Sequence, residues 1–589
     1  MYFEWCIVVE RNKSKYEILV ELAKRRGIFW PAYEIYGGVA GFYDFGPIGL
    51  SIKNNIMNEW RYYLIHNVDV NVVEIETPII TPRIVLKASG HEDHFTDPIT
   101  ECKSCGRVYR ADHLIEETIG KKVEGLSMDE LWKIIQEHNI KCPECGGELT
   151  KPKPALLLFK TEIGPYKGSK AYLRPETAQG MFINFKNILN IARNKLPLGI
   201  AQIGRVGRNE ISPRQGLLRL REFTIMELEF FFDPEKSHEE VLNILKKRDE
   251  LRNEKLNILT AKTKLEGKEE TQTYTTIELI EENIVANPWM AYWMAIGNIF
   301  LRKIGIPPNK IRFDEKLPEE KAHYSEQTFD QEVLTEKYGW IEVAGYSYRT
   351  TYDLKRHIEY SKADLTFFKK YEKPKKIKKK KIAPNPTKIR ELAGEKFPLV
   401  MKALSEMDKE SLLLELESKG YIDVLDVKIP KTAFYIEEEE VLVHGEKIIP
   451  HVVEPSFGLE RIFYVLLENS LHITSDQKIV LKLPYRIAPY MTAVFPLVSG
   501  TRPEHAKMVN LARKIKETLI SNRITVYYDE EGSIGKRYVR ADEIGIPLAI
   551  TVDYQSIEDN TVTIRYRDTR EQKRIHIDKI VEEISQYFK

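Results

Sequence analysis

The chain has 589 residues, and its 89 lysines and arginines are balanced by 88 aspartates and glutamates to a net charge of +1. This balance excludes a generalised coating for nucleic acid, so a polyanionic partner would have to be met by local patches. At ~150 residues per domain, the length predicts three or four domains. The sequence shows no basic leader with a cleavage site and no uncharged apolar run of bilayer length, so we expect a cytoplasmic protein that does not enter a membrane.

The N-terminal region opens with an amphipathic helix, predicted from Ser14 to Arg26 because Ser14 and Glu17 form a capping box. A stretch rich in glycine and aromatic residues follows over residues 28–50. Two explanations of this stretch remain open. The default is tight turns beside aromatic core residues, and the alternative is a loop shaped around a partner surface or a substrate.

A helix is predicted over residues 51–68 and an extended segment over residues 70–80. His91 and His94 follow in a stretch that offers no third metal ligand nearby. We therefore expect solvated or hydrogen-bonded loop histidines here rather than a metal site.

Four of the five cysteines form two C-x-x-C pairs, Cys102 with Cys105 and Cys142 with Cys145, each followed by glycine. In a reducing compartment, such pairs favour a tetrahedral thiolate site for structural zinc over disulfides. The alternatives are reduced core cysteines or a redox pair, whereas catalytic zinc is disfavoured because no open-site ligand is evident. The segment between the pairs includes a helix predicted over residues 127–138 from a capping box.

The stretch from Gly204 to Glu229 is predicted to be a hairpin around a turn at residues 211–217, which holds serine, proline and glycine. Strand alternation places Arg208 and Glu210 on one face of the incoming strand. On one face of the outgoing strand it places Phe223, Ile225, Glu227 and Glu229. Five arginines flank the turn: Arg205, Arg208, Arg214, Arg219 and Arg221. This mixture suits a ligand with phosphates, a planar base and an ammonium group, and the alternative is a surface ribbon with ion pairs.

Beyond the hairpin, residues 236–258 have a charged helical pattern and the segment up to Asn283 is polar, which predicts an inserted or peripheral module. A core helix is predicted over residues 289–305. The lysine run 369–381 predicts a solvated, mobile segment, with an RNA-contacting loop as the alternative. The acidic patch 437–440 has no evident chemistry.

Residues 451–467 predict a strand that carries Glu454 and Ser456 on one face and then a helix opened by Gly458. Arg461 lies off the buried stripe of that helix, which leaves it free to meet a ligand. From about residue 482, short apolar strands alternate with helices and predict a compact α/β domain.

Three stretches together resemble the three motifs of the class II aminoacyl-tRNA synthetases. They are Glu74-Ile-Glu-Thr-Pro78 running on to KASGHEDHF, then GRVGRNEISPRQGLLRLREF, and EPSFGLER. Four more, RADHL, YLRPETAQG, KAHYSEQTFD and YGWIEVAG, are similar to the dimeric glycyl-tRNA synthetases of the archaeal and eukaryotic kind. The resemblance covers nearly the whole chain, although R-N-E or G-L-E-R alone would be weak.

The resemblance implies an α+β fold: a class II antiparallel β-sheet catalytic core flanked by helices and interrupted by insertions, with a C-terminal α/β anticodon-binding domain. The expected core segments are 1–99, with the first motif and dimer interface, 161–235, 289–360 and 441–479. The expected insertions are the zinc knuckle 100–160, a helical and polar segment 236–288, and a basic segment 361–440. The anticodon-binding domain is expected at 480–589.

The implied reaction is attack of the glycine carboxylate on the α-phosphorus of ATP, followed by transfer of glycine to the terminal adenosine of tRNA(Gly). Arg208 would hold the α-phosphate, and Arg461 would cover adenine and reach the γ-phosphate. Phe223 would stack on the other adenine face. Arg219 would support the β- and γ-phosphates, and Glu342 would bind the Mg²⁺ that ATP brings.

For glycine itself, the resemblance assigns the ammonium to three carboxylates: Glu176, Glu227 and Glu454. Arg110 and Arg349 would meet the substrate carboxylate or the adenylate, and Ser456 would sit close to the α-carbon. Glycine has no side chain to grip, so selectivity would rest on steric exclusion together with recognition of the ammonium.

Further residues are expected at the site from their place in the motifs. The glycine and adenylate site would also include Thr224, Ile225, Met226, Pro455, Phe457 and Gly458. The ATP site would also include Asn209, Glu210, Leu218, Leu220, Arg221, Glu222, Val343, Leu459 and Glu460. The implied partners are glycine, ATP with Mg²⁺, tRNA(Gly) and a second copy in a symmetric homodimer.

Two rivals share parts of this pattern. A synthetase for threonine, proline or serine would share the core, but three carboxylates converging on a small pocket favour glycine. A non-catalytic homologue would share the fold, but retention of Arg208, Glu227, Glu454 and Arg461 together favours an enzyme.

Overall fold

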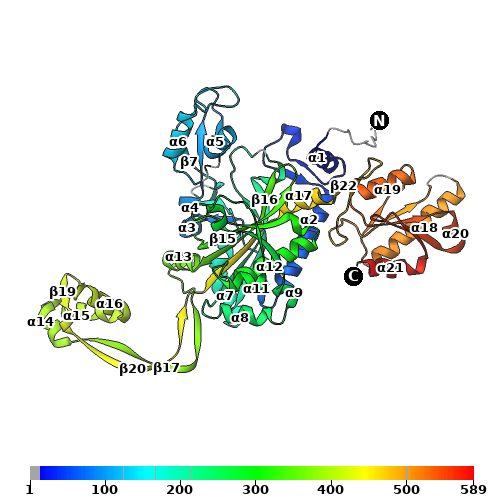
Figure 1. The fold of residues 1–589 in the computed structure, drawn as a ribbon. Helices are drawn as coiled ribbons and strands as arrows, with labels where there is room; N and C mark the ends of the chain where they lie inside the picture. Colours follow the sequence, from blue (N-terminus) through cyan, green and yellow to red (C-terminus); the bar gives the residue numbers. More distant parts are fainter. Residues whose placement is uncertain are drawn as a thin grey trace. The chain divides into compact units, whose positions relative to one another are not determined.

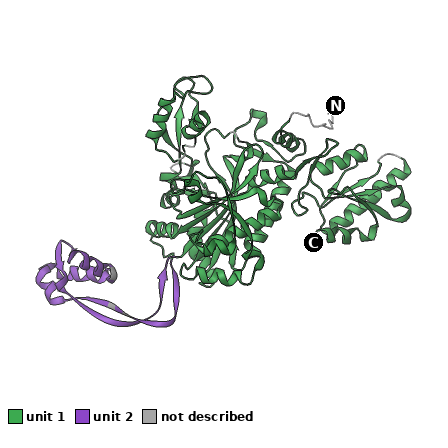
Figure 2. Ribbon diagram, in the orientation of Figure 1, with its two compact units in different colours: residues 1–365, 450–589 green, residues 366–449 purple. Residues whose placement is uncertain are grey.

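The computed structural model describes residues 13–121, 123, 125–165, 168–213, 215–498 and 502–588. The chain forms two compact units, residues 1–365 with 450–589 and residues 366–449 (Figure 2). Among the helices of the described residues, none has both the length and the apolarity needed to cross a membrane.

The first unit is built on a nine-stranded sheet, in the order β13-β12-β14-β15-β16-β21-β11-β10-β3 (Figure 1). The strands are β13 (Gln272–Thr275), β12 (Lys255–Leu259), β14 (Ile311–Glu315), β15 (Gln327–Thr335), β16 (Gly339–Thr350), β21 (His451–Gly458), β11 (Glu222–Phe232), β10 (Leu198–Gly207) and β3 (Asn71–Glu74). Neighbours are antiparallel except for the pairs β12–β14 and β10–β3. The largely antiparallel core expected from the motifs is confirmed.

The segment 236–288, expected as an inserted module, contributes two strands to this sheet. Its helices are short, α8 (Ser237–Leu245) and α9 (Asp249–Arg252), and the charged pattern that predicted helix up to residue 258 ends instead in β12. The apolar residues Leu256 and Ile258 of β12 are buried in the main core, which favours a strand there over a solvated helix.

The hairpin β10–β11 shows the predicted alternation. On one face of β11, four side chains enter the main hydrophobic core: Met226, Leu228, Phe230 and Phe232. Phe230 packs there against Trp289 and Trp293 of α12 (Pro288–Lys303), the predicted core helix. The opposite face carries Glu227 and Glu229. One strand therefore separates the core from a polar face.

Helices of the first unit begin largely as their caps predict. The capping boxes Ser14/Glu17 and Ser127/Glu130 open α1 (Lys15–Arg25) and α6 (Met128–Glu137). Thr177 directly precedes α7 (Ala178–Ile191), but its hydroxyl makes no cap bond because it donates to Glu227 instead.

Residues 100–160 form a module on the three-stranded sheet β6-β5-β7, made of β6 (Val108–Arg110), β5 (Thr96–Glu101) and β7 (Lys153–Leu156). Its core includes α5 (Ala111–Ile119) and α6. Because β6 runs directly into α5, the module presents the residues at that junction in a fixed orientation.

The second unit corrects the expectation of a mobile lysine run. Residues 369–381 lie in β17 (Phe367–Pro384), which pairs with β20 (Phe434–Ile448). The register places Lys378 opposite Glu440 and Lys381 opposite Glu437, so the acidic patch without evident chemistry offsets the lysines. Beyond this ribbon lies a small core of α14 (Pro386–Ala393), α15 (Phe397–Glu406), α16 (Lys409–Lys419), β18 (Tyr421–Val424) and β19 (Val427–Pro430).

The C-terminal region forms the predicted α/β domain. Its sheet has the order β25-β24-β26-β27-β28, made of β25 (Val526–Tyr528), β24 (Thr492–Pro496), β26 (Leu548–Val552), β27 (Thr561–Tyr566) and β28 (Gln572–His576). Its helices are α18 (Pro503–Ser521), α19 (Ile534–Glu543), α20 (Tyr554–Asp559) and α21 (Ile580–Tyr587). It has a hydrophobic core of its own.

The packing of α12 on the sheet yields a stability prediction. A Cβ at Gly297 would lie 1.8 Å from Tyr346 Oη and 3.1 Å from Phe457 Cζ. Gly297→Ala should therefore lower stability by ~1–3 kcal/mol through overpacking, seen as a lower midpoint of thermal unfolding. Gly535→Ala in α19, where a Cβ would meet nothing within 4 Å, is the matched control and should not lower the midpoint. Equal midpoints for the two variants would contradict the close contact.

Candidate active site

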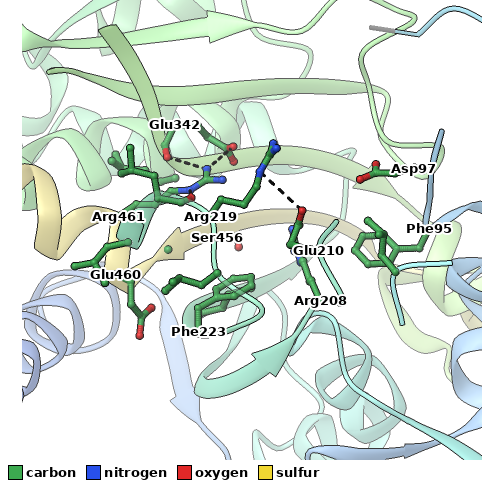
Figure 3. A pocket seen from close by; sticks show the side chains of 18 of the residues that line it. Phe95, Asp97, Arg208, Glu210, Arg219, Phe223, Glu342, Ser456, Glu460 and Arg461 are labelled. Atoms are coloured by element: carbon green, nitrogen blue, oxygen red, sulfur yellow. Dashed lines mark hydrogen bonds and ion pairs between the residues drawn. The ribbon is translucent and has the colours of Figure 1, made fainter. Parts of the chain in front are cut away.

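A cavity of about 370 Å³ opens between the β10–β11 hairpin, β16 and the start of α17 (Leu459–Ser470) (Figure 3). Strand alternation explains the position of Phe223 and Ile225, which lie on the face of β11 opposite the core. The cavity is lined by Phe95, Asp97, Arg110, Leu157, Arg208, Glu210, Leu217, Leu218, Arg219, Leu220, Phe223, Ile225, Glu342, Val343, Ala344, Ser456, Gly458, Glu460 and Arg461. Residues from three predicted motifs therefore meet in one cavity.

Arg208 lies just beyond the end of β10 with its guanidinium near two aromatic rings. Its centre is 5.3 Å from the ring centroid of Phe223 and 5.5 Å from that of Phe95, and its Nε donates to the carbonyl of Pro175 at 3.1 Å. Within the described part of the chain, Arg208 forms no ion pair. A cation held in place by rings and a carbonyl keeps its charge available to an anion.

Arg461, on the first turn of α17, closes another side of the cavity. Its Nη1 donates to Oε2 of Glu342 at 2.7 Å and to the Glu342 carbonyl at 3.0 Å, and its Nε donates to the Leu218 carbonyl at 3.1 Å. Burial raises the pKa of Glu342, but the charges of Arg461 and Lys316 outweigh it and lower that pKa overall. Glu342 is therefore a carboxylate that faces the cavity.

Arg219 reaches the cavity from the hairpin connection and is oriented by a histidine. Its Nη1 donates to Nδ1 of His113 at 3.0 Å, and its Nε lies 3.8 Å from Oε2 of Glu210. Burial, together with the charges of Arg110 and Arg219, lowers the pKa of His113 to about 4. His113 is thus neutral near pH 7 and accepts from Arg219 without repelling it.

Arg110, at the junction of β6 and α5, is held by two carboxylates. Its Nε and Nη2 donate to Asp112 at 3.0 and 2.5 Å, and its Nη1 lies 3.1 Å from Asp97. Burial raises the pKa of Asp97 to about 6. The bidentate pair fixes the guanidinium plane at the edge of the cavity.

Glu227 is buried next to Ser456, which lines the cavity. The backbone N and the hydroxyl of Thr177 donate to its Oε2 at 2.7 and 2.5 Å, and the Ser456 hydroxyl donates to its Oε1 at 2.8 Å. Burial and the charge of nearby Glu176 raise the pKa of Glu227. Its lone pairs are thus only partly satisfied, and a cation placed beside it would favour the ionised form.

Two more carboxylates, Glu176 and Glu454, are buried beside Glu227. Glu176 accepts from Gln179 at 3.0 Å and lies 3.2 Å from Nε2 of His91. Glu454 accepts from Arg349 at 2.8 Å. Burial raises the pKa of Glu454 to about 8, a shift that Arg349 opposes and Glu227 increases. The three expected ammonium ligands are therefore close neighbours, and two of them, Glu227 and Glu454, hold their protons more strongly than isolated carboxyl groups do.

Glu229 belongs to the same group. The register pairs Glu227 with Ser456 and Phe230 with Val453, so Glu229 lies opposite Glu454. Glu229 is fully buried and its carboxylate has no hydrogen-bond partner within the described part of the chain. Burial first, and then the charge of Glu454, raise its pKa well above the usual range. Glu229 therefore lies beside the expected ammonium ligands and holds its proton more strongly than an isolated carboxyl group does.

Arg349 lies behind these carboxylates and does not line the cavity, where it was expected to meet substrate. It is fully buried, forms a bidentate pair with Asp353 at 2.8 and 2.9 Å, and lies under the ring of Tyr324 at 3.7 Å. Its donors are used by Asp353 and Glu454, so its guanidinium orients these two carboxylates.

Several other expected site residues also point elsewhere. Met226, Phe457 and Leu459 belong to the main core, since strand and helix periodicity turns them away from the cavity. Glu460 lines the cavity, yet its carboxylate is held by Lys53 at 2.6 Å and by the Thr224 backbone N at 2.8 Å. The remaining expected residues do not line the cavity, although each is next in the chain to a residue that does: Thr224, Asn209, Arg221, Glu222 and Pro455. Arg214 lies outside the described residues.

Sequence reasoning missed His91, Asp97, Asp112, His113 and Thr177. His91, expected as a solvated or hydrogen-bonded loop residue, is hydrogen-bonded but lies buried in α4 (His91–His94), with Nδ1 2.8 Å from the Ser89 hydroxyl. Asp112 and His113 stand in RADHL and Thr177 in YLRPETAQG, so the motif strings could have identified them. Asp97 had no such signal.

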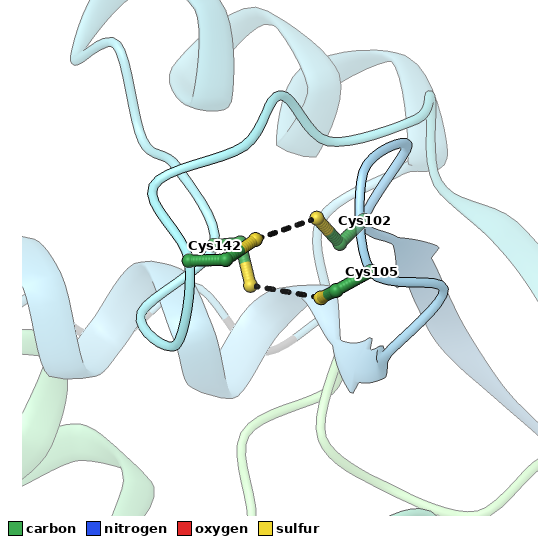
Figure 4. Close-up of side chains that lie close together, drawn as sticks. Cys102, Cys105 and Cys142 are labelled. Atoms are coloured by element: carbon green, nitrogen blue, oxygen red, sulfur yellow. Dashed lines mark hydrogen bonds between the residues drawn. The ribbon is translucent and has the colours of Figure 1, made fainter.

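The four paired cysteines come together away from the cavity. Cys102 Sγ lies 3.5 Å from Cys145 Sγ, and Cys105 Sγ lies 3.7 Å from Cys142 Sγ (Figure 4). All four sulfur atoms are within 4.8 Å of one another. Four thiol groups on two facing turns fit a tetrahedral metal site. The Tyr109 hydroxyl lies 3.3 Å from Cys142 Sγ, and Tyr109 is next in the chain to Arg110.

Comparisons with known proteins agree with this geometry. Residues 159–265 match the family model described as the tRNA synthetase class II core domain (G, H, P, S and T), and residues 492–587 match the anticodon binding domain. Among solved structures, a prolyl-tRNA synthetase of Giardia lamblia in complex with prolyl-adenylate has a similar fold. The TM-score is 0.52 at 14% identity, over 97% of this chain and 79% of that one.

Full-length relatives are more similar. The glycine–tRNA ligase of Aeropyrum pernix is 49% identical over 97% of this chain and 96% of its own length. That of Pyrococcus horikoshii is 47% identical over 96% of this chain and 97% of its own, and that of Methanocaldococcus jannaschii is 43% identical over 98% and 100%. The chain belongs to the glycine–tRNA ligase family of class II aminoacyl-tRNA synthetases, which join glycine to its tRNA by way of an adenylate.

Proposed function

We propose that the cavity and the carboxylates beside it are the place where glycine and ATP react, and that their side chains divide the work by charge. One observation carries this proposal: four arginines line the cavity, while three buried carboxylates lie beside it, one of which, Glu227, accepts from Ser456 of the lining. Phosphates suit the arginine side, and an ammonium suits the carboxylate side.

In the proposed first step, the glycine carboxylate attacks the α-phosphorus of ATP and pyrophosphate leaves. Arg208 neutralises charge on the α-phosphate, and Arg219 and Arg461 neutralise charge on the β- and γ-phosphates. Phe223 stacks on adenine. No general base is needed because glycine arrives as a carboxylate, so the protein contributes positioning and electrostatic stabilisation. In the second step the glycyl group passes to the terminal adenosine of tRNA(Gly).

Glycine is held by its ammonium between Glu176, Glu227 and Glu454, with Ser456 beside the α-carbon. Thr177 and Ser456 fix Glu227 through three hydrogen bonds, so the site has little freedom to expand. An added methyl group would cost about 1–3 kcal/mol in such a rigid site, which disfavours alanine. Arg110 lies at the edge of the cavity, where it would contact the adenylate.

Glu342 is the side chain that would hold Mg²⁺ brought by ATP, and the metal when bound would neutralise phosphate charge. Cys102, Cys105, Cys142 and Cys145 would hold structural zinc that braces the module carrying Arg110. We also propose a symmetric homodimer that uses the first motif, a C-terminal domain that binds the anticodon, and a cytoplasmic location.

The assignment to glycine is tested by pyrophosphate exchange with different amino acids. Exchange should be driven by glycine far better than by alanine, serine, threonine or proline, and tRNA(Gly) should then accept glycine. Exchange driven better by alanine or serine would contradict the assignment. Absence of any glycine-dependent exchange in a folded, zinc-replete preparation would favour a non-catalytic protein.

Arg208→Ala should lower glycine-dependent ATP–pyrophosphate exchange by at least about 10²- to 10³-fold, because a preorganised donor to the α-phosphate is lost. Arg205→Ala is the matched control, since that arginine lies on the same hairpin but is exposed and paired with Glu222 at 2.7 Å. It should retain nearly full activity. Full activity of Arg208→Ala would support a merely ion-paired ribbon.

His113→Phe should raise the KM for ATP by about ten-fold or more, because Arg219 loses the acceptor that orients it. His113→Asn offers an oxygen near the position of Nδ1 and should restore most of the affinity. Because the pKa of His113 is about 4, its imidazole is neutral throughout pH 6 to 8. The ratio of the KM of the Phe variant to the KM of the wild type should therefore be constant over this range. A ratio that changes steeply over this range would contradict a neutral acceptor.

The cysteine site should bind about one zinc per chain, measured by elemental analysis of the purified protein. Cys105→Ser should lower the zinc content and increase amide hydrogen exchange in residues 100–160, because the two turns lose their common ligand. Ser104→Ala, a neighbour without a ligand atom for the metal, should change neither. Unchanged zinc content in the cysteine variant would place the metal elsewhere.

A further inference from the structure

Residues Tyr33 to Val39, here called the tyrosine loop, expose large apolar side chains to solvent. Tyr33 is 53% exposed, Ile35 87%, Tyr36 84% and Val39 44%. The sequence left two explanations for this stretch, turns beside the core or a loop shaped around a partner. A contiguous exposed apolar group on an otherwise well-packed unit favours the partner.

The loop is built as a defined turn. Tyr33 has a left-handed backbone with φ of 61°, and Gly37 and Gly38 follow with φ of 89° and 76°. The amides of Tyr36 and Gly38 both donate to the Tyr33 carbonyl, at 2.9 and 3.0 Å. The Tyr33 ring packs edge-on against Phe42. A non-glycine residue held in this conformation signals a turn whose shape is maintained by its surroundings, and this shape points Ile35 and Tyr36 outward.

The tyrosine loop adjoins the hairpin connection that leads into the cavity. Just beyond the loop, the Gly41 carbonyl accepts from the Arg221 backbone N at 2.9 Å, and the Ala40 carbonyl accepts from Arg221 Nη1 at 2.8 Å. A Cβ at Gly41 would lie 2.6 Å from Pro213 Cγ. Arg219, two residues before Arg221, lines the cavity. The loop is thus attached to the same connection as a residue of the site.

We propose that the tyrosine loop is a docking surface for the unpaired 3′ end of the acceptor arm of tRNA, with a base stacked on Tyr36 and flanked by Ile35. This inference rests on the proposed function in one respect, that the terminal adenosine must enter this cavity in the second step. Single-stranded RNA offers splayed bases, and exposed aromatic rings bind them by stacking with little dependence on sequence. A second copy of the chain is the other occupant of an exposed apolar surface, and attachment to the hairpin beside the cavity favours RNA.

The test uses the full chain with Ile35→Ser and Tyr36→Ala combined, and two RNA probes: tRNA(Gly) and the same RNA without its last four nucleotides. The double variant should keep wild-type ATP–pyrophosphate exchange, which needs no tRNA. Its KM for tRNA should rise about ten-fold, as expected for loss of one stacked base. As competitors, the two RNAs should differ in affinity for the wild type and differ less for the variant.

Two further variants control the experiment. Tyr36→Phe retains the ring and should behave as the wild type. Leu265→Ala removes a comparably exposed apolar side chain elsewhere, 72% exposed at the end of α10 (Ala261–Leu265), and should leave the KM for tRNA unchanged.

Three outcomes would overturn the proposal. They are an unchanged KM for tRNA in the double variant, undiminished discrimination between the two RNAs, or a change of oligomeric state in sedimentation velocity, which would assign the loop to a second copy. Loss of exchange in the variant would show a structural role instead. Absence of exchange in the wild type would contradict the proposed function and not this inference alone.

Discussion

The site depends on a shortage of positive charge among buried groups. Five carboxyl groups, those of Glu176, Glu227, Glu229, Asp353 and Glu454, are buried close together, and the buried guanidinium groups beside them are those of Arg349 and Arg174. Burying charges is costly unless they are paired, so the cluster responds by raised pKa values at Glu227, Glu229 and Glu454. In the proposed function, the ammonium group of glycine supplies the positive charge that this cluster lacks.

Much of this architecture was predictable from local patterns. Strand alternation assigned Glu227 and Glu229 to the face opposite the core, and the capping boxes at Ser14 and Ser127 located two helices. These features depend on neighbours in sequence, which is why periodicity finds them.

Features that depend on distant partners were not predictable in this way. Threonine is a common helix-capping residue, but the hydroxyl of Thr177 donates to Glu227 instead. Arg349 matched a ligand-binding position, yet Asp353 and Glu454 occupy its donors. The lysine run was expected to be mobile, because its partner strand lies more than fifty residues later in the chain. Met226 and Phe457 were included by motif membership, although alternation alone directs them into the core.

The ribbon of β17 and β20 also bears on how its two strands reach their correct register. Most of its side chains are exposed, and buried apolar residues select the alignment of the strands only at the end where Ile382 and Phe434 enter the core of the second unit. Its cross-strand ion pairs, such as Lys376 with Glu440 and Lys378 with Glu438 at 3.7 Å, are individually weak because they are exposed. The four lysines 378–381 lie opposite the four glutamates 440–437, and a one-residue slip would place one of these lysines opposite a neutral residue. Electrostatic complementarity thus favours the observed register along the exposed part of the ribbon, and this contribution is sensitive to salt.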